Sequence, residues 1–376
     1  MIISYSRKDN MTTINKNSVI KINNGTNNII KSEETNNEEI VGKEDANSFP
    51  NIQIVSDIPK IIHANTHTNI HSNIGIDIDA VFLWVDMRDE AWLKKYRQYT
   101  GRNPETLRYK DYGELEFSVK LLLKHCKFIR NIYIVTDNQI PNWYSKEEYP
   151  TITIVDHSQI LDDRCHRPTF KSDSIEAYIH RISGLSEYYL YLNDDTFIGN
   201  NCNEFSFIDR RTMLPIARFI SAPLGDNIKM QAIMGRVYPR AASLTNAMNC
   251  VKRTYGGHHN KSPLHQCCIL RKSMAELAWQ LFPTELARSV KYPTRNPIND
   301  TISFTLLSML LGITTNRMKA EVDRYSIRIY MNYSMAKGGA YSNFMKILQQ
   351  RPQLFCINDL NDRDIQLFES FKKKYY

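Results

Sequence analysis

Acidic side chains end four apolar segments of this sequence, and they are the first sign of chemistry. Asp86, Asp137 and Asp156 each end one segment, and the pair Asp194–Asp195 ends a fourth. Carboxylates a few ångströms apart repel one another, so a cluster of them is stable when a cation binds or when one acid keeps its proton. For Asp137 and Asp156 we favour the simpler interpretation, in which each caps the next helix or turn. For Asp194 and Asp195 we favour a divalent metal or a catalytic role.

Imidazole and guanidinium groups form a second candidate site. His265 lies in the segment GGHHNKSPLHQ, and Arg295 lies in PTRNPIND. Near neutral pH an imidazole can accept or donate a proton or act as a nucleophile, and a guanidinium binds phosphate oxygens through its planar fork. Glu176, in SDSIEAYIHRI, could complete a metal or base site with the acid pair. Taken singly, each of these residues is more often an ordinary surface or core residue, so the residues alone leave both interpretations open.

The apolar segments before the acids are predicted to be strands. They cover Ala80–Asp86, Asn131–Asp137, Thr151–His157 and Tyr188–Asp195. Helices are predicted between them, at Arg88–Tyr99, Tyr112–Cys126 and Asp173–Ile182. Continuous apolar strands that alternate with helices indicate an α/β fold with a Rossmann-like, mostly parallel sheet flanked by helices. Ligands bind such sheets outside the carboxyl ends of the strands, which is where the acids would meet.

The chain divides into a tail, residues 1–75, and a part predicted to fold, residues 76–376. The tail is rich in asparagine, has no aromatic anchor between Tyr5 and Phe49, and carries a net charge of −1 against +9 for the rest. With little to bury, it is predicted to be disordered. Within the folding part we expect a Rossmann-like core over 76–210 and a helical part over 211–376. The predicted helices of the second part cover 240–255, 272–290 and Thr301–Leu311.

The composition indicates where in the cell the protein is expected and which partners it is expected to bind. The apolar stretch Ser303–Ile313 is about half the length that a bilayer span needs. The first residues lack the features of a signal peptide, and the seven cysteines lack zinc-type spacing, so we expect a cytoplasmic protein with reduced thiols. The basic excess favours nucleic acid, phosphorylated substrates or an anionic membrane surface, although solubility explains it equally well. Because no RNP-like or helix-turn-helix pattern is present, we expect no nucleic-acid partner.

Four blocks of the sequence occur in the order of a known family. They are IDAVFLWVDMRDEAW (Ile78–Trp92), the long segment Tyr112–Gly199, the segment Ser243–Ile313 with SPLHQ and TRNPINDTISF, and FCINDLNDRD (Phe355–Asp364). Together they resemble the Stealth proteins, which include bacterial capsular polysaccharide phosphotransferases and the catalytic subunit of the animal N-acetylglucosamine-1-phosphotransferase. The resemblance spans most of 76–376 and implies a GT-A-like fold whose second part completes the active site.

The activity that this resemblance implies is sugar-phosphate transfer. A hexose-1-phosphate, such as N-acetylhexosamine-1-phosphate, would pass from a UDP-sugar to a sugar hydroxyl of an oligosaccharide-phosphate acceptor in a growing capsule polymer, with release of UMP. The expected cofactor is Mg²⁺ or Mn²⁺. Peripheral contact with the inner face of the cytoplasmic membrane and with capsule-export machinery is a further expectation. Two alternatives stay open: a metal-dependent glycosyltransferase that releases UDP, and a non-enzymatic protein that binds an anionic polymer or nucleic acid.

The resemblance also assigns roles to individual residues. His265 would be the base, acid or phosphoryl carrier, with Glu176 and Arg295 as further catalytic residues. The metal would be held by Asp195, with Asp194 and Asp359. Substrate contacts are implied for Asp86, Asp89, Arg108 and Arg236.

Overall fold

A computed structural model describes residues 75–223, 239–257, 259–295, 300–323, 326–330 and 339–376, all within the unit Phe49–Tyr376. Residues 1–74, which were predicted to be a disordered tail, and Arg236 lie outside the described residues.

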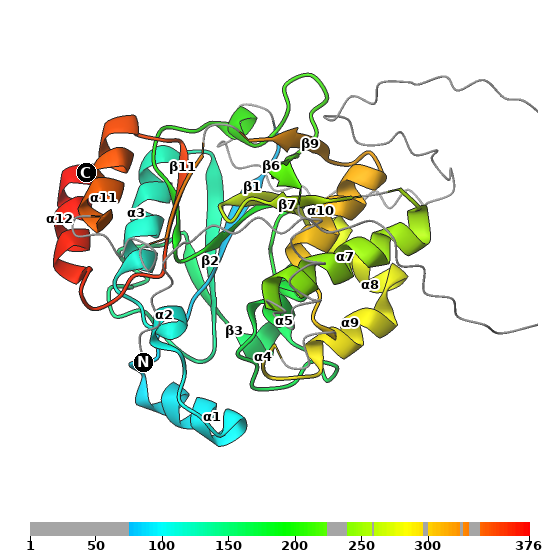
Figure 1. The fold of residues 1–376 in the computed structure, drawn as a ribbon, viewed down its shortest axis with the longest axis horizontal. Coiled ribbons are helices and arrows are strands. Elements are labelled where there is room, and N and C mark those ends of the chain that lie inside the picture. Colours follow the sequence, from blue (N-terminus) through cyan, green and yellow to red (C-terminus); the bar gives the residue numbers. More distant parts are fainter. Residues whose placement is uncertain (1–74, 224–238, 258, 296–299, 324–325, 331–338) are drawn as a thin grey trace, which may run out of the picture. The chain divides into compact units, whose positions relative to one another are not determined.

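A five-stranded sheet forms the centre of the fold (Figure 1). The order across the sheet is β3-β2-β1-β4-β8. Strands β1 to β4 run parallel to one another, and β8 runs antiparallel to β4 at the edge. The strands are β1 (Ile78–Leu83), β2 (Ile129–Thr136), β3 (Ile152–Asp156), β4 (Tyr188–Asn193) and β8 (Cys268–Arg271). The Rossmann-like, mostly parallel sheet expected from the sequence is confirmed, and so are the four strands predicted from apolar runs.

Helices cover both faces of this sheet, which is why its strands are apolar on both sides (Figure 1). All six residues of β1 are buried. Ile78, Ala80 and Phe82 pack in the cluster that contains Leu115 of α3, whereas Val81 and Leu83 pack in the cluster of the opposite face. The helices are α1 (Glu90–Thr100), α2 (Thr106–Tyr109), α3 (Glu114–His125), α4 (His157–Ile160), α5 (Ser172–Glu176), α7 (Pro239–Tyr255), α8 (Lys272–Leu281), α9 (Pro283–Val290), α10 (Phe304–Thr314), α11 (Gly339–Gln350) and α12 (Ile365–Tyr375).

The helix predicted over Asp173–Ile182 is broken in the middle. Helix α5 ends at Glu176, and a 3-10 turn follows at Ile179–Arg181. The backbone carbonyl of Ala177 accepts a hydrogen bond of 2.8 Å from the indole Nε1 of Trp279. The amide of Arg181, which would bond this carbonyl in a continuous α-helix, bonds the carbonyl of Tyr178 instead. A tertiary contact therefore overrides the local helical pattern.

The second part of the chain holds the predicted helices and also strands that were not predicted. Strand β8 completes the central sheet, and two three-stranded sheets have the orders β10-β11-β5 and β7-β6-β9. Their strands are β5 (Thr196–Ile198), β6 (Ile216–Pro223), β7 (Lys261–Pro263), β9 (Lys319–Val322), β10 (Ile327–Tyr330) and β11 (Leu354–Asn358). The description of 211–376 as a helical part is therefore incomplete.

The C-terminal elements pack on the side of α3 that faces away from the central sheet. Phe117 of α3 lies in a cluster with Phe197 of β5, Phe355 of β11 and Phe371 of α12. Figure 1 shows α11 and α12 beside α3, at the opposite side of the sheet from α7 to α10. This cluster holds β11 against β5, which matters because both strands lead into the site described below.

Two findings relate to the expected cytoplasmic location. Among the described residues, the structure contains no helix with the length and apolar character required to span a bilayer. All seven cysteines are described, and each is a free thiol, as predicted.

Candidate functional site

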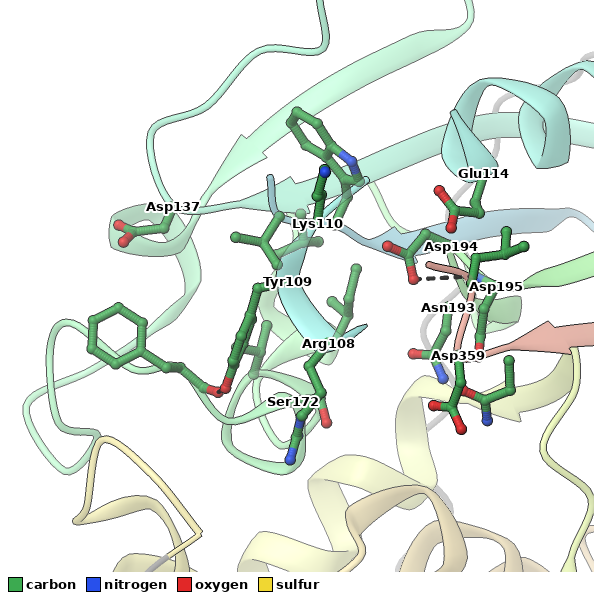
Figure 2. Close-up of a pocket in the computed structure, with 18 of the residues that line it drawn as sticks. Arg108, Tyr109, Lys110, Glu114, Asp137, Ser172, Asn193, Asp194, Asp195 and Asp359 are labelled. Carbon is green, nitrogen blue, oxygen red and sulfur yellow. Dashed lines mark hydrogen bonds between the residues drawn. The ribbon is translucent and has the colours of Figure 1, made fainter. Parts of the chain in front are cut away.

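A cavity of about 350 Å³ opens at the carboxyl edge of the central sheet. Residues that follow β1, β2 and β4 line it, because parallel strands bring their carboxyl ends to one edge. Residues that the sequence analysis singled out and that line it are Arg108, Asp137, Asp194, Asp195, His265, Arg295 and Asp359. Figure 2 shows carboxylates gathered at one end, Arg108, Tyr109 and Ser172 in the middle, and Asp137 at the other end.

Carboxylates and an amide form the acidic end of the cavity. Asn193 ends β4, and Asp194 and Asp195 follow it in a turn before β5. Asp359 follows β11 with a positive φ of 62°, a backbone conformation that Asp tolerates better than most residues. Glu114 enters from the first residue of α3. The sequence thus brings four carboxyl groups from three separate segments to one wall.

Burial and mutual repulsion both disfavour the ionised form of carboxyl groups at this end of the cavity. Burial raises the pKa of Asp194 well above its usual range, and the charges of Asp195 and Asp111 raise it further. Burial also raises the pKa of Glu114, with Asp111 as the next cause. Their oxygen donors are the ligands that Mg²⁺ and Mn²⁺ prefer, and a cation would relieve the repulsion. The residues present therefore fit the expected metal.

His265 meets the acid pair directly. Its Nε2 lies 3.1 Å from Oδ2 of Asp195, and both side chains are largely shielded from solvent. His265 comes from the loop between β7 and β8, so the antiparallel pairing of β8 with β4 carries it to the carboxyl edge. The thiol of Cys356, on β11, lies 3.6 Å from the same Asp195 oxygen. Sequence positions 195, 265 and 356 thus converge on one point.

Arg295 forms the cationic wall. Its Nε donates to Asp173 over 3.1 Å, and an Nη donates to Ser172 over 3.2 Å. Burial lowers the pKa of Arg295, but the carboxylates of Asp173 and Glu176 raise it by more. Arg108 also lines the cavity, and its guanidinium lies 5.6 Å from the centre of the Tyr109 ring. Two guanidinium groups, of which Arg295 is held by hydrogen bonds and Arg108 is exposed, beside an acidic wall are suited to binding a phosphate ester.

Glu176 lies beneath the cavity wall and does not line it. Its carboxylate accepts hydrogen bonds from Tyr191 Oη over 3.0 Å and from Thr305 Oγ1 over 2.6 Å. Burial raises its pKa, and the charge of Asp173 adds to the effect. The side chain therefore ties α5 to β4 and α10, and its negative charge faces Arg295.

The remaining acids of the first strands have local partners. Asp86 pairs with Arg88 and Asp89 caps α1 by accepting from the amide of Trp92, and neither lines the cavity. Asp156 caps α4 in a capping box, as predicted. The prediction that Asp137 is a cap is wrong, because its carboxylate pairs at 2.9 Å with Lys95 of α1.

Several lining residues were not predicted. Arg240 enters from the start of α7, and Lys110 follows Arg108. Neither belongs to a pattern that marks it out in the sequence. Trp92, Tyr109 and Phe170 also line the cavity, and the ring centres of Tyr109 and Phe170 lie 5.4 and 5.6 Å from that of Trp92. These side chains cluster because α1, α2 and the segment before α5 are in tertiary contact. The spacing of the residues along the sequence does not reveal this contact.

Comparisons with known proteins point to one family. Conserved region 2 of the Stealth proteins matches residues 108–215. A capsular polysaccharide phosphotransferase of Actinobacillus suis is 30% identical over 340 residues, which cover 85% of this chain and 86% of that protein. The capsular polysaccharide phosphotransferase fcs1 of Haemophilus influenzae is 32% identical over 303 residues, covering 76% and 79%. The capsular polysaccharide phosphotransferase LcbA of Neisseria meningitidis is 29% identical over 310 residues, covering 79% and 81%.

Proposed function

Since this chain belongs to the Stealth family of capsular polysaccharide phosphotransferases, we propose that it transfers a hexose-1-phosphate from a UDP-sugar to a hydroxyl of a growing capsule polymer. An N-acetylhexosamine-1-phosphate is one such group. The acceptor is an oligosaccharide phosphate, and the product is a phosphodiester.

The observation that carries this proposal is the meeting of His265, Asp195 and Arg295 around one cavity. A proton-accepting imidazole and a fixed guanidinium are the groups that attack on a phosphorus atom requires. Ordinary glycosyl transfer with release of UDP needs the acidic strand ends but has no requirement for this imidazole and guanidinium pair. The arrangement therefore supports phosphoryl chemistry over glycosyl chemistry.

In the proposed reaction the acceptor hydroxyl oxygen attacks the β-phosphorus of the UDP-sugar. The new P–O bond forms as the bond between that phosphorus and the bridging oxygen breaks, and UMP leaves with the bridging oxygen. The glycosidic C–O bond survives. His265 takes the hydroxyl proton, and Asp195, 3.1 Å away, orients the imidazole and stabilises its protonated form.

Arg295 holds the β-phosphoryl oxygens. Its guanidinium is fixed on one side by Asp173 and Ser172, so its orientation is set before the substrate binds. Arg108 and Arg240 add positive charge along the same cavity. The aromatic cluster of Trp92, Tyr109 and Phe170 would take the base of the nucleotide by stacking.

Mg²⁺ or Mn²⁺ would be held by Asp194, Asp195 and Asp359, whose carboxylates line the acidic end. When bound, the cation neutralises charge on the pyrophosphate. Burial raises the pKa of Asp194 and the charges of Asp195 and Asp111 raise it further, and a bound cation would favour the ionised form of this carboxyl.

Contact with the inner membrane and with export machinery is part of the same proposal. Lys373, Lys374 and Tyr376 are exposed at the end of α12, where they could touch an anionic surface.

The products decide between the candidate reactions. Purified protein is incubated with a panel of nucleotide-sugars, Mg²⁺ and an oligosaccharide phosphate, and the products are separated by chromatography and examined by phosphorus NMR. We expect UMP and a new phosphodiester signal. Release of UDP with no phosphodiester would establish glycosyl transfer instead, and no nucleotide product would remove the enzymatic assignment.

The metal assignment has its own test. We expect excess chelator to abolish turnover and added Mg²⁺ or Mn²⁺ to restore it, and Asp359→Asn to lower turnover strongly while the protein stays folded. Asp163→Asn is the matched control, because that side chain is 97% exposed and lies outside the cavity lining. Full turnover in excess chelator would show that the acids have another role.

A further inference from the structure

Three side chains at the acidic end carry three different ligand atoms. They are a carboxylate oxygen of Asp195, an imidazole nitrogen of His265 and the sulfur of Cys356, and these atoms all lie within 4.8 Å of one another. Cys356 is buried, whereas the other two side chains line the cavity. An ion could therefore reach the group from the cavity and find the thiol at its inner side.

Backbone pairing fixes this arrangement. Cys356 on β11 lies opposite Thr196 on β5, and the amide of Ile357 donates to the carbonyl of Asp195 over 3.0 Å. His265 is placed by the adjoining strand β8, which pairs with β4. Cys356 lies on a strand, and Asp195 and His265 lie in short connections whose ends are held by paired strands, which lowers the cost of organising a metal site.

The distances suit a small tetrahedral ion. Oδ2 of Asp195 lies 3.1 Å from Nε2 of His265 and 3.6 Å from the sulfur of Cys356. Around a tetrahedral zinc ion, with bonds of about 2.0 Å to N and O and about 2.3 Å to S, neighbouring ligand atoms lie about 3.3 to 3.5 Å apart. The sulfur lies within 4.8 Å of the ligand nitrogen of His265, and shortening this third distance is the adjustment that the site would need.

The chemistry of the three ligands separates this group from the oxygen ligands expected for Mg²⁺. Thiolate and imidazole ligands favour Zn²⁺, and Mg²⁺ binds them poorly. Three protein ligands leave a fourth position, which water or a phosphate oxygen can fill. The two sites would share Asp195, so their cations would compete.

We propose that Asp195, His265 and Cys356 form a Zn²⁺ site, and that Zn²⁺ bound there inhibits the enzyme. Binding converts the Cys356 thiol to a thiolate, and its proton leaves to solvent. The ion takes the lone pair of His265 Nε2, and the hydrogen of the neutral ring then sits on Nδ1, so neither nitrogen can accept the acceptor's proton. The inhibitory effect rests on the proposed function, whereas the binding of the ion does not.

Binding is tested without any substrate. Metal-free, full-length protein is titrated with Co²⁺, which reports thiolate ligation through a charge-transfer absorption band in the near ultraviolet, and then with Zn²⁺ against a chromophoric chelator. We expect one ion per chain, the cobalt–thiolate band, and at least a roughly tenfold loss of Zn²⁺ affinity together with loss of the band in Cys356→Ser. Cys202→Ser, which alters a partly exposed thiol outside the cavity lining, is the matched control and should behave as wild type.

Two results would overturn the site. One is wild-type protein that gives no cobalt–thiolate band, a measurement that needs no variant to fold. The other is Cys356→Ser with unchanged Zn²⁺ affinity. In the transfer assay with Mg²⁺, micromolar Zn²⁺ should inhibit wild type and Cys202→Ser more strongly than Cys356→Ser. A wild-type protein that binds Zn²⁺ but never transfers a sugar phosphate would contradict the proposed function and leave the metal site established.

Discussion

Asp195 is the side chain through which the candidate site is held together. Its carboxylate lies against His265 and the thiol of Cys356, its amide donates to Asp194, and its carbonyl accepts from Ile357. Few rotamers of Asp195 satisfy these neighbours together, so its carboxylate is fixed before any ligand binds. The orientation of His265 is fixed with it.

Loss of the imidazole is the sharpest test at the residue scale. We expect His265→Ala to lower turnover by about 10² to 10⁴, the range typical of a lost general base. Binding of the nucleotide-sugar should change little, because a group that acts in the transition state affects turnover more than ground-state affinity. Turnover and nucleotide-sugar binding are measured on the same preparation. The control is His125→Ala, at a partly exposed site outside the cavity lining whose side chain bonds Asn201. Near-normal turnover in His265→Ala would remove His265 from the mechanism.

Arg295→Lys keeps the charge and removes the planar fork. Lysine is unable to bond Asp173, Ser172 and a phosphoryl oxygen in the same geometry, so we expect turnover to fall roughly ten- to hundredfold. Steady-state kinetics with the preferred donor measure the change. The same substitution at Arg288, which is exposed on α9, should have no effect; equal turnover in both variants would show that the shape of the guanidinium is unimportant.

At the scale of elements, the junction of β3 and α4 shows how a buried histidine affects stability. Asp156 caps α4, and His157 is the first helical residue and is buried. Burial lowers the pKa of His157 to about 4, although Asp137 and Asp156 oppose the shift and Lys95 assists it. An unfolded histidine has a pKa of about 6.5, so the unfolded chain takes up a proton that the folded chain excludes.

Stability should therefore fall with pH in a defined window. The folded pKa of His157 is the lower one, so its contribution is complete above about pH 6.5 and is lost as the pH falls towards 4. At pH 5 the loss is about 2 kcal/mol of unfolding free energy. We expect urea denaturation at pH 7 and pH 5 to show a smaller difference for His157→Gln than for wild type. His125→Gln, at a partly exposed position, should keep the wild-type difference, and equal pH dependence in all three proteins would contradict the assignment.

Elements that depend on local pattern could be predicted, and elements that depend on distant partners could not. Strands β1 to β4 are apolar on both faces, so runs such as Val81–Leu83 identify them without knowledge of the rest of the fold. Strand β11 has only five residues, and its pairing with β5 joins positions about 160 apart, as in Phe355 opposite Phe197. Spacing along the chain contains no signal for such a pair.

The same distinction explains the site. The acid pair and His265 were identified from residue types and from resemblance, and the structure brings them together. Cys356 was missed because a single cysteine in an apolar strand has no distinguishing pattern. The break in the helix after Glu176 was missed because its cause is Trp279, about one hundred positions later in the chain.

At the scale of the whole molecule, the cavity is assembled from distant segments of the described chain. Residues that line it range from Leu83 to Leu360. The first 70 residues contribute none of the described lining and none of the blocks that resemble the family.

Removal of the N-terminal segment should therefore leave the chemistry intact. We expect protein that lacks residues 1–70 to express in soluble form and to transfer sugar phosphate at a rate within a fewfold of full length. Turnover on short and long acceptors is compared for the two proteins. Loss of turnover on both acceptors would show that the segment supports the fold, and loss on long acceptors alone would show that it binds the polymer.

The antiparallel pairing of β11 with β5 also determines when, during synthesis and folding, the candidate site can be completed. Chains are made from the N-terminus at about 5 to 20 residues per second, and the central strands can pair while later segments are still inside the ribosome. Asp359 and β11, the strand that supports Asp195, emerge after all five strands of the central sheet. A nascent chain can thus hold a nearly complete sheet while its candidate site is still unfinished. The site is complete only after β11 has paired with β5.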